Sequence, residues 1–142
     1  MISKILLLIL LSISFISAQT DREKVAVLPI HSVTFRSKSA ELTERILDEL
    51  FKMDLFLVRE QSEVIDVLAQ QGLHNGCAEK ICAVSVGESL MVQKVIFGTI
   101  RQKGGEFKIK LEMVDVQTGD IVKKSTHSVQ GGYKDVVSNG IM

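Results

Sequence analysis

Tryptophan is absent from this 142-residue sequence, tyrosine occurs once, and neither sign of charge is in excess. The 17 basic residues balance the 17 acidic residues. Proteins that bind nucleic acids usually combine a basic patch with aromatic side chains on which bases stack. A balanced charge also gives little attraction to an anionic membrane surface. We therefore expect no nucleic-acid partner and no electrostatic binding to such a membrane.

Motifs that would mark an enzyme are also missing. The histidines, His31, His74 and His127, lie in separate segments and lack the His-Glu-x-x-His spacing of a metalloprotease. No Gly-x-Ser-x-Gly stretch, which would position a hydrolase nucleophile, occurs in the sequence. The acidic residues between positions 41 and 49 share the polar side of an expected helix with Arg45. This pattern is typical of a solvated helix surface rather than of a catalytic carboxylate cluster. We expect no enzyme activity, no cofactor and no metal.

Only two cysteines are present, Cys77 and Cys82. In an exported protein an even number of cysteines suggests a disulfide. Two free thiols and a metal site are the alternatives, although a metal would need further ligands. A thiolate can be stabilised at a helix start, so Cys77 could also act as a nucleophile. The Cys-x₄-Cys spacing differs from that of thiol oxidoreductases, and we favour a Cys77–Cys82 disulfide.

The N-terminus has the order of a secretory signal peptide. Lys4 is followed by an apolar stretch over residues 5–16, then by small residues, and the chain turns polar after Ala18. The apolar stretch is shorter than the ~20 residues of a membrane-spanning helix. We predict a signal peptide over residues 1–18, cleaved between Ala18 and Gln19, with an uncleaved anchor as the alternative. No cysteine lies near the cut, so we expect a periplasmic or extracellular protein without a lipid anchor.

Residues 19–142 are long enough for one domain. The first half predicts a strand, a helix and a strand. Residues 24–30 form an almost continuous apolar run, which is typical of a strand buried on both faces. A helix is expected over about Ala40–Met53, with Ser39 as its N-cap, and a second buried strand over Leu55–Val58. The helix residues expected to face the core are Leu42, Ile46, Leu47, Leu50 and Phe51.

Two further helices are expected, over Gln61–Gln71 and about Ala78–Leu90. Gly72 follows the first of them, at a position suited to a left-handed backbone. The inward-facing residues expected on these helices are Val64, Ile65, Leu68, Ile81, Cys82, Val86 and Leu90.

In the second half the pattern changes to the alternation of strands. Three strands are predicted, over Val95–Gln102, Phe107–Met113 and Ile121–Val129, joined by turns rich in glycine. The tail, residues 131–142, starts a weak helical pattern at Tyr133, Val136 and Val137. The order β-α-β-α-α-β-β-β predicts an α/β (α+β) fold with a single mixed sheet. Its helix-linked strands should be parallel, its last three strands an antiparallel meander, and helices should cover at least one face.

Several stretches of the mature chain together resemble a known family by their order and spacing. These stretches are Val25–Pro29, Leu42–Arg45 with Glu49–Phe51, Phe56–Ser62, Gln71–Leu73, Gly76–Cys77 with Cys82–Val84 and Val86–Gly87, Val95–Ile100, and Leu111–Val122. By their order and spacing, the chain resembles the curli-assembly (CsgG-like) family and its relatives with the fold of the TolB N-terminal domain.

The resemblance implies a non-enzymatic accessory protein of the cell envelope that binds another envelope protein or itself. Tight turns at residues 103–106 and 117–120 stand where the curli secretion protein has pore-forming hairpins, so no pore is expected. The family also tends to end in a longer helix, so we expect a truncated C-terminus. The alternatives are a thiol-redox enzyme of the envelope that uses its cysteine pair, and a structural subunit that oligomerises through its sheet edge. The candidate partner surface comprises His74, Asn75, Lys108, Lys110 and Lys124.

Overall fold

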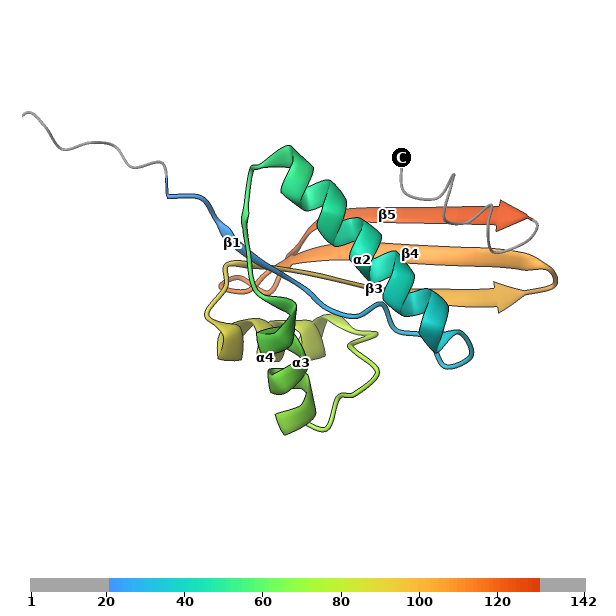
Figure 1. Ribbon diagram of the computed structural model, residues 1–142, viewed down its shortest axis with the longest axis horizontal. Helices are drawn as coiled ribbons and strands as arrows, with labels where there is room; N and C mark the ends of the chain where they lie inside the picture. The colour runs from blue at the N-terminus through green and yellow to red at the C-terminus, as the bar shows by residue number, and fades with distance from the viewer. Residues whose placement is uncertain (1–20, 131–142) are drawn as a thin grey trace, which may run out of the picture.

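The computed structural model describes residues 21–130, which form one five-stranded sheet with three helices. The elements in chain order are β1 (Lys24–Val27), α2 (Arg36–Met53), β2 (Leu57–Val58), α3 (Gln61–Gln70), α4 (Lys80–Leu90), β3 (Lys94–Lys103), β4 (Glu106–Asp115) and β5 (Ile121–Gln130). The strands lie in the order β2-β1-β3-β4-β5 (Figure 1). β1 pairs in parallel with β2 and β3, whereas β3, β4 and β5 form an antiparallel meander. The predicted fold class and element order are confirmed.

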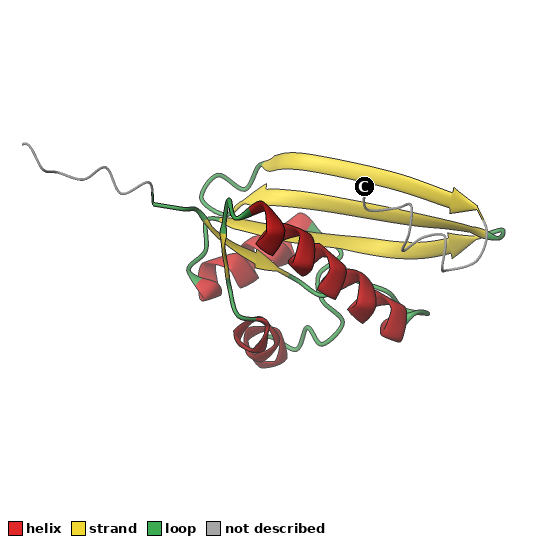
Figure 2. Cartoon of the chain, turned by 45° about the horizontal axis from the view of Figure 1, so that its top comes forward, coloured by secondary structure: helices red, strands yellow, loops and turns green. Residues whose placement is uncertain are grey.

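Helices cover both faces of the sheet near β1 and β3, and side chains alternate between two cores. On one face, strand residues such as Ala26 and Phe97 pack against α3 and α4. On the other face, Val27 and Ile100 pack against α2, which crosses the sheet in Figure 2. Residues 95–100 of β3 are all buried, because both of their faces are covered. This double coverage explains why the central strands read as continuous apolar runs.

The outer part of the sheet, at β5, is not covered in this way by the described helices. No residue of β5 is buried, and none of the described elements pairs with its outer edge. Figure 1 shows β5 on the outer side of the sheet, away from α3 and α4. β5 nevertheless pairs with β4 over nearly its whole length. The sheet therefore extends beyond the helices that cover its centre.

Two glycines permit close packing around β3. A Cβ atom on Gly98 would overlap the backbone carbonyl oxygen of Lys110 on β4. A Cβ atom on Gly87 of α4 would lie 2.7 Å from Cγ2 of Val95 and 2.6 Å from Cγ2 of Val116. Because neither glycine has a side chain, β4 and α4 can approach β3 closely at these two points.

The structure corrects the predicted start of the first helix. α2 begins at Arg36 rather than at about Ala40, so Ser39 is not an N-cap. Ser39 is instead buried inside the helix, where its hydroxyl donates to the carbonyl oxygen of Ile30. The hydroxyl of Thr43 accepts from the backbone N–H of Ile30 at 3.0 Å. These two hydroxyl groups satisfy the backbone N–H and C=O of Ile30, just after β1. The helical pattern of the sequence did not reveal this role.

Three side chains predicted to face the core are exposed. Phe51 is 62% exposed, Ile65 is 53% exposed and Ile81 is 79% exposed. Phe51 and Ile65 each directly follow a buried residue, Leu50 and Val64, and one step along a helix rotates the side chain by about 100°. Ile81 lies in the first turn of α4, which begins at Lys80 rather than at Ala78, and the buried stripe of that helix starts only with Ala83.

Other boundaries change less. β2 is limited to Leu57–Val58, the two residues that pair with β1, and contrary to the prediction neither of them is buried. α3 ends at Gln70. Gly72 has the left-handed backbone that was predicted for it, with φ of 72°. The signal peptide, its cleavage site and the weakly helical tail lie outside the described residues. Among residues 21–130, no helix has both the length and the apolar character required to cross a membrane.

Candidate partner-binding surface

The first part of the candidate surface is the loop between α3 and α4. His74 and Asn75 are exposed there, and the backbone carbonyl oxygen of Asn75 lies 3.1 Å from Nδ1 of His31. Gly76 follows with φ of 75°, and a Cβ atom on it would overlap the carbonyl oxygen of Pro29. The loop is therefore held against the segment that follows β1, and its exposed residues border a hollow of about 130 Å³.

The cysteine pair lies at the end of this loop. The structure places the sulfur atoms of Cys77 and Cys82 at disulfide distance, with 5.7 Å between their Cα atoms. Cys77 is 1% exposed and belongs to the core between the sheet and helices α3 and α4. A substrate has little access to such a sulfur atom, so the geometry favours a structural bridge that ties the loop to the start of α4.

The second part of the candidate surface lies on the meander. On β4, Phe107 and Ile109 point into the core beneath α2, so the alternating residues Lys108 and Lys110 point to the opposite face. Lys124 of β5 is paired with Glu112 of β4 and shares that face. The three lysines predicted as a surface therefore do lie together, whereas His74 and Asn75 belong to a loop at β1, with β3 between β1 and the meander lysines.

Strand pairing adds a cation that the sequence analysis did not select. Arg101 of β3 is exposed and lies directly opposite Lys108. We call Arg101, Lys108, Lys110 and Lys124 the basic face. Arg101 can be placed beside Lys108 only when the register of β3 and β4 is known. The tight Gly104-Gly105 turn is the sequence signal that could have given this register.

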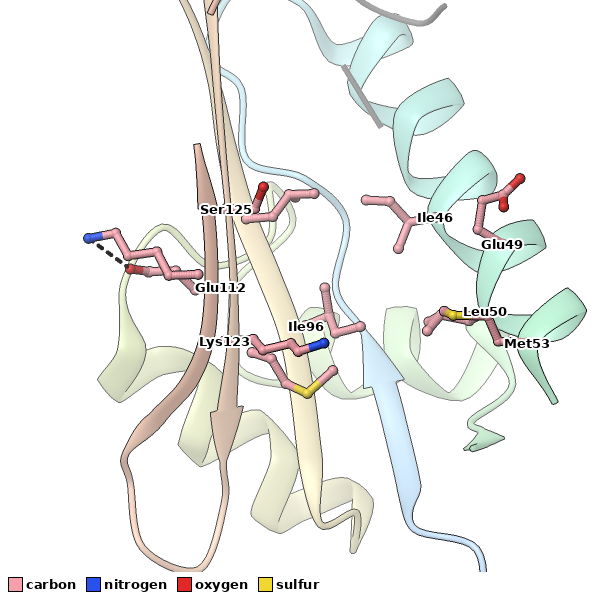
Figure 3. A pocket seen from close by; sticks show the side chains of 11 residues that line it. Ile46, Glu49, Leu50, Met53, Ile96, Glu112, Lys123 and Ser125 are labelled. Atoms are coloured by element: carbon pink, nitrogen blue, oxygen red, sulfur yellow. Dashed lines mark ion pairs between the residues drawn. The ribbon is translucent and has the colours of Figure 1, made fainter. Parts of the chain in front are cut away.

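One carboxylate lies within the basic face. Glu112 Oε1 is 3.0 Å from Nζ of Lys110 and 3.9 Å from Nζ of Lys124. Figure 3 shows Glu112 on the side of the sheet that faces away from α2. At the hairpin tip, Lys103 of β3 lies opposite Glu106 of β4 in the strand register, so these two residues add no net charge to the face. The face therefore retains an excess of positive charge, although the whole chain is neutral.

The other face of the meander carries a groove that the sequence did not indicate. It has a volume of about 470 Å³ and lies between α2 and strands β3, β4 and β5 (Figure 3). Its walls are mainly apolar and include Ile46, Leu50, Met53, Ile96, Leu111 and Met113. The charged residues of the lining are Glu49, Glu112, Lys123 and Lys124. The sequence could not predict the groove, because it arises from the distance between a helix and the outer strands.

A partly exposed ion-pair cluster fixes the base of the meander and is separate from this surface. Nζ of Lys94 lies 2.9 Å from Oδ2 of Asp115 and 3.1 Å from Oε1 of Glu23. The hydrogen bond from Lys94, supported by the backbone N–H of Thr118, lowers the pKa of Asp115 from 3.8 to about 2. The same hydrogen bond raises the pKa of Lys94 above its usual value. Both shifts favour the charged forms, so this cluster stabilises the junction between β3 and β4.

Known structures show where this fold occurs, whereas no family model and no curated protein sequence matches the chain. The LpoB C-terminal domain from Salmonella enterica aligns with a TM-score of 0.60 and 17% identity, over 80% of this chain and 87% of that one. The corresponding Escherichia coli domain gives a TM-score of 0.59 and 16% identity, over 77% of this chain and 83% of that one. Lipoprotein GNA1162 from Neisseria meningitidis aligns with a TM-score of 0.62 and 16% identity, over 84% of this chain and 88% of that one. The chain shares the fold of these proteins.

Proposed function

We propose that this protein is a non-enzymatic accessory protein of the cell envelope, which acts by binding another envelope protein. The signal-like N-terminus supports export. The shared fold supports the same compartment, because one of the proteins with this fold is a lipoprotein, a class of exported proteins anchored in membranes.

The finer proposal is a module similar to the curli-assembly (CsgG-like) proteins but without their pore-forming hairpins. It is released by cleavage between Ala18 and Gln19, carries no lipid anchor and works in the periplasm or outside the cell. N-terminal sequencing of the exported protein tests this, and an intact Met1 on protein recovered from the cytosol would contradict it.

The observation that carries the binding role is the basic face on the uncovered half of the sheet. Helices bury the central strands, yet the chain keeps ten-residue strands beyond them, with no buried residue on β5. Arg101, Lys108, Lys110 and Lys124 are spread over three adjacent strands of this rigid sheet. Charges held on a rigid sheet can select and orient a partner of opposite charge.

The test compares two triple variants with the same change in charge. Lys108→Gln, Lys110→Gln and Lys124→Gln neutralise the basic face, whereas Arg45→Gln, Lys52→Gln and Lys80→Gln neutralise cations on the helices. Each tagged protein is used to capture partners from a detergent extract of the cell envelope, and thermal melts confirm that all are folded. We expect the wild type and the helix variant to retain a common partner that the basic-face variant loses.

Retention of the same partner by the basic-face variant would rule out this surface. The alternative of a thiol-redox enzyme is tested separately by thiol titration of the native protein. A readily reduced Cys77–Cys82 pair with a thiol of low pKa would support the enzyme, whereas an unreactive pair supports the binding role.

A further inference from the structure

The two edges of the sheet differ greatly in length. The edge strand β2 comprises only Leu57–Val58, whereas β5 at the other edge extends over ten residues. Long edge strands are usually protected by lysines, proline, a bulge or a covering element, because their unpaired backbone groups can bind another strand. The lysines of β5 would oppose a second basic strand but would attract an acidic one. β5 contains no proline, and its one irregularity lies near its start, where Met113 and Val114 of β4 shift register. Residues 123–130 are therefore a regular strand.

Within residues 21–130 no strand pairs with the outer edge of β5, which we call the open edge, and the pairing pattern identifies its backbone groups. The two-residue turn Gly104-Gly105 makes Lys103 and Glu106 a hydrogen-bonded pair, and such pairs alternate along an antiparallel ladder. Odd-numbered residues of β4 therefore bond to β5, in agreement with the 2.9 Å bond from the N–H of Asp115 to Asp120. Their partners include Ser125 and His127. It follows that the N–H and C=O groups of Lys124, Thr126 and Ser128 point to the open edge.

The charge beside this edge indicates the kind of strand that fits it. β5 contains Lys123 and Lys124 but no acidic residue, and these lysines lie on opposite faces of the sheet. The basic face continues inward from Lys124 through Lys110 and Lys108. An added strand would place alternating side chains next to these cations, and carboxylates directly opposite them are favourable. A second copy would add another β5 with the same lysines, so it matches the charge less well.

We propose that β5 binds an extended, Asp/Glu-rich segment of a partner protein, which adds to the sheet as a sixth strand. Backbone hydrogen bonds to Lys124, Thr126 and Ser128 provide the affinity, and the lysines provide the preference for acidic side chains. The inference rests on the proposed binding role and specifies the partner segment and its mode of binding.

The test uses a ten-residue peptide of alternating threonine and glutamate, with a threonine–lysine peptide as its control. In Thr126→Pro, the N–H that points to the edge is removed while the ladder to β4 is kept, and proline is tolerated at such a position. Thr126→Ala is the matched control, because it removes the side chain and keeps the N–H. We expect binding of the acidic peptide by the wild type and Thr126→Ala, and binding about tenfold weaker by Thr126→Pro. The lysine peptide should not bind.

Amide hydrogen exchange of the wild-type protein gives a second readout that does not depend on the proline variant folding. The acidic peptide should protect the amides of Lys124, Thr126 and Ser128 more than those of Ser125 and His127, which already bond to β4. Equal protection of all five, or none, would overturn the proposed added strand.

Other outcomes are equally decisive. Unchanged binding by Thr126→Pro would mean that the peptide contacts only side chains, which rejects the edge while the proposed partner binding through the basic face stands. Equal binding of the lysine peptide would overturn the acidic preference. A concentration-dependent dimer in light scattering that Thr126→Pro abolishes would identify a second copy as the occupant instead.

Discussion

The central and outer halves of this sheet use the same backbone geometry for different purposes. In β3, residues 95–100 are buried between α2 on one face and helices α3 and α4 on the other. In β5, no side chain is buried, and polar side chains occupy seven of the ten positions. The comparison teaches that the centre provides the stability of the fold, whereas the outer strands are held by pairing and leave their surface available for binding.

The largest difference should appear when one side chain in each half is shortened to alanine. Phe97 is fully buried, so Phe97→Ala should lower the free energy of unfolding by about 3–5 kcal/mol. Thr126→Ala on β5 should change it by less than about 0.5 kcal/mol. Urea unfolding measures both, and similar losses in the two variants would contradict the division of the sheet.

A smaller effect should come from filling the close contact where the two halves meet. Gly98→Ala would press a methyl group against the backbone of Lys110, which cannot move without breaking the ladder, so we expect a loss of about 1–3 kcal/mol. Gly87→Ala is the matched control, because its neighbours are the ends of Val95 and Val116, which can shift. A greater loss for Gly87→Ala in the same urea experiment would show that β4 is more adaptable than we infer.

The cysteine pair tests whether the helix layer and the binding surface are independent. Cys82→Ala opens a short loop, and the loop-closure entropy predicts a loss of about 2 kcal/mol in unfolding free energy. In the presence of a reductant, the unfolding free energy of the wild-type protein should fall by a similar amount. Capture of a partner through the basic face should stay unchanged, since the pair lies beneath the other half of the sheet; loss of capture in folded Cys82→Ala would link the two regions.

The smallest effect concerns pH at the base of the meander. Because the pKa of Asp115 is lowered from 3.8 to about 2 in the folded protein, its contribution to stability is present above pH 3.8. That contribution is lost as the pH falls through about 2. Asp115→Asn should therefore be less stable than the wild type near neutral pH, and the difference should shrink toward pH 2. Chemical unfolding at a series of pH values measures it, and a difference independent of pH would refute this role.

Local patterns predicted the elements and the face of the three lysines. Alternation along residues 107–113 was enough to separate the core side of β4 from Lys108 and Lys110, because the side chains of a strand have a period of two. The continuous apolar run at residues 24–30 indicated a strand covered on both faces. Such signals depend only on neighbouring residues, so they can be read without knowing the tertiary structure.

What the sequence could not provide depends on contacts between distant segments. Ser39 resembled an N-cap, but its hydroxyl serves Ile30 at the end of β1, and this role exists only after α2 packs on the sheet. Arg101 joins the basic face through strand register, and the groove beside Met113 depends on the placement of α2. The exposed side chain of Ile81 shows that an apolar residue near a helix start need not belong to the buried stripe.

The pairing of β1 with β3 has a consequence for the order in which the chain folds. β1 starts the domain, yet its partner in the middle of the sheet is residues 94–96, and all three helices lie between them in sequence. Closing so long a loop slows folding, whereas the hairpins of the meander need only local contacts. We expect the meander to form first and β1 to join last, so that during synthesis β1 stays unpaired with the rest of the sheet until β3 has been made.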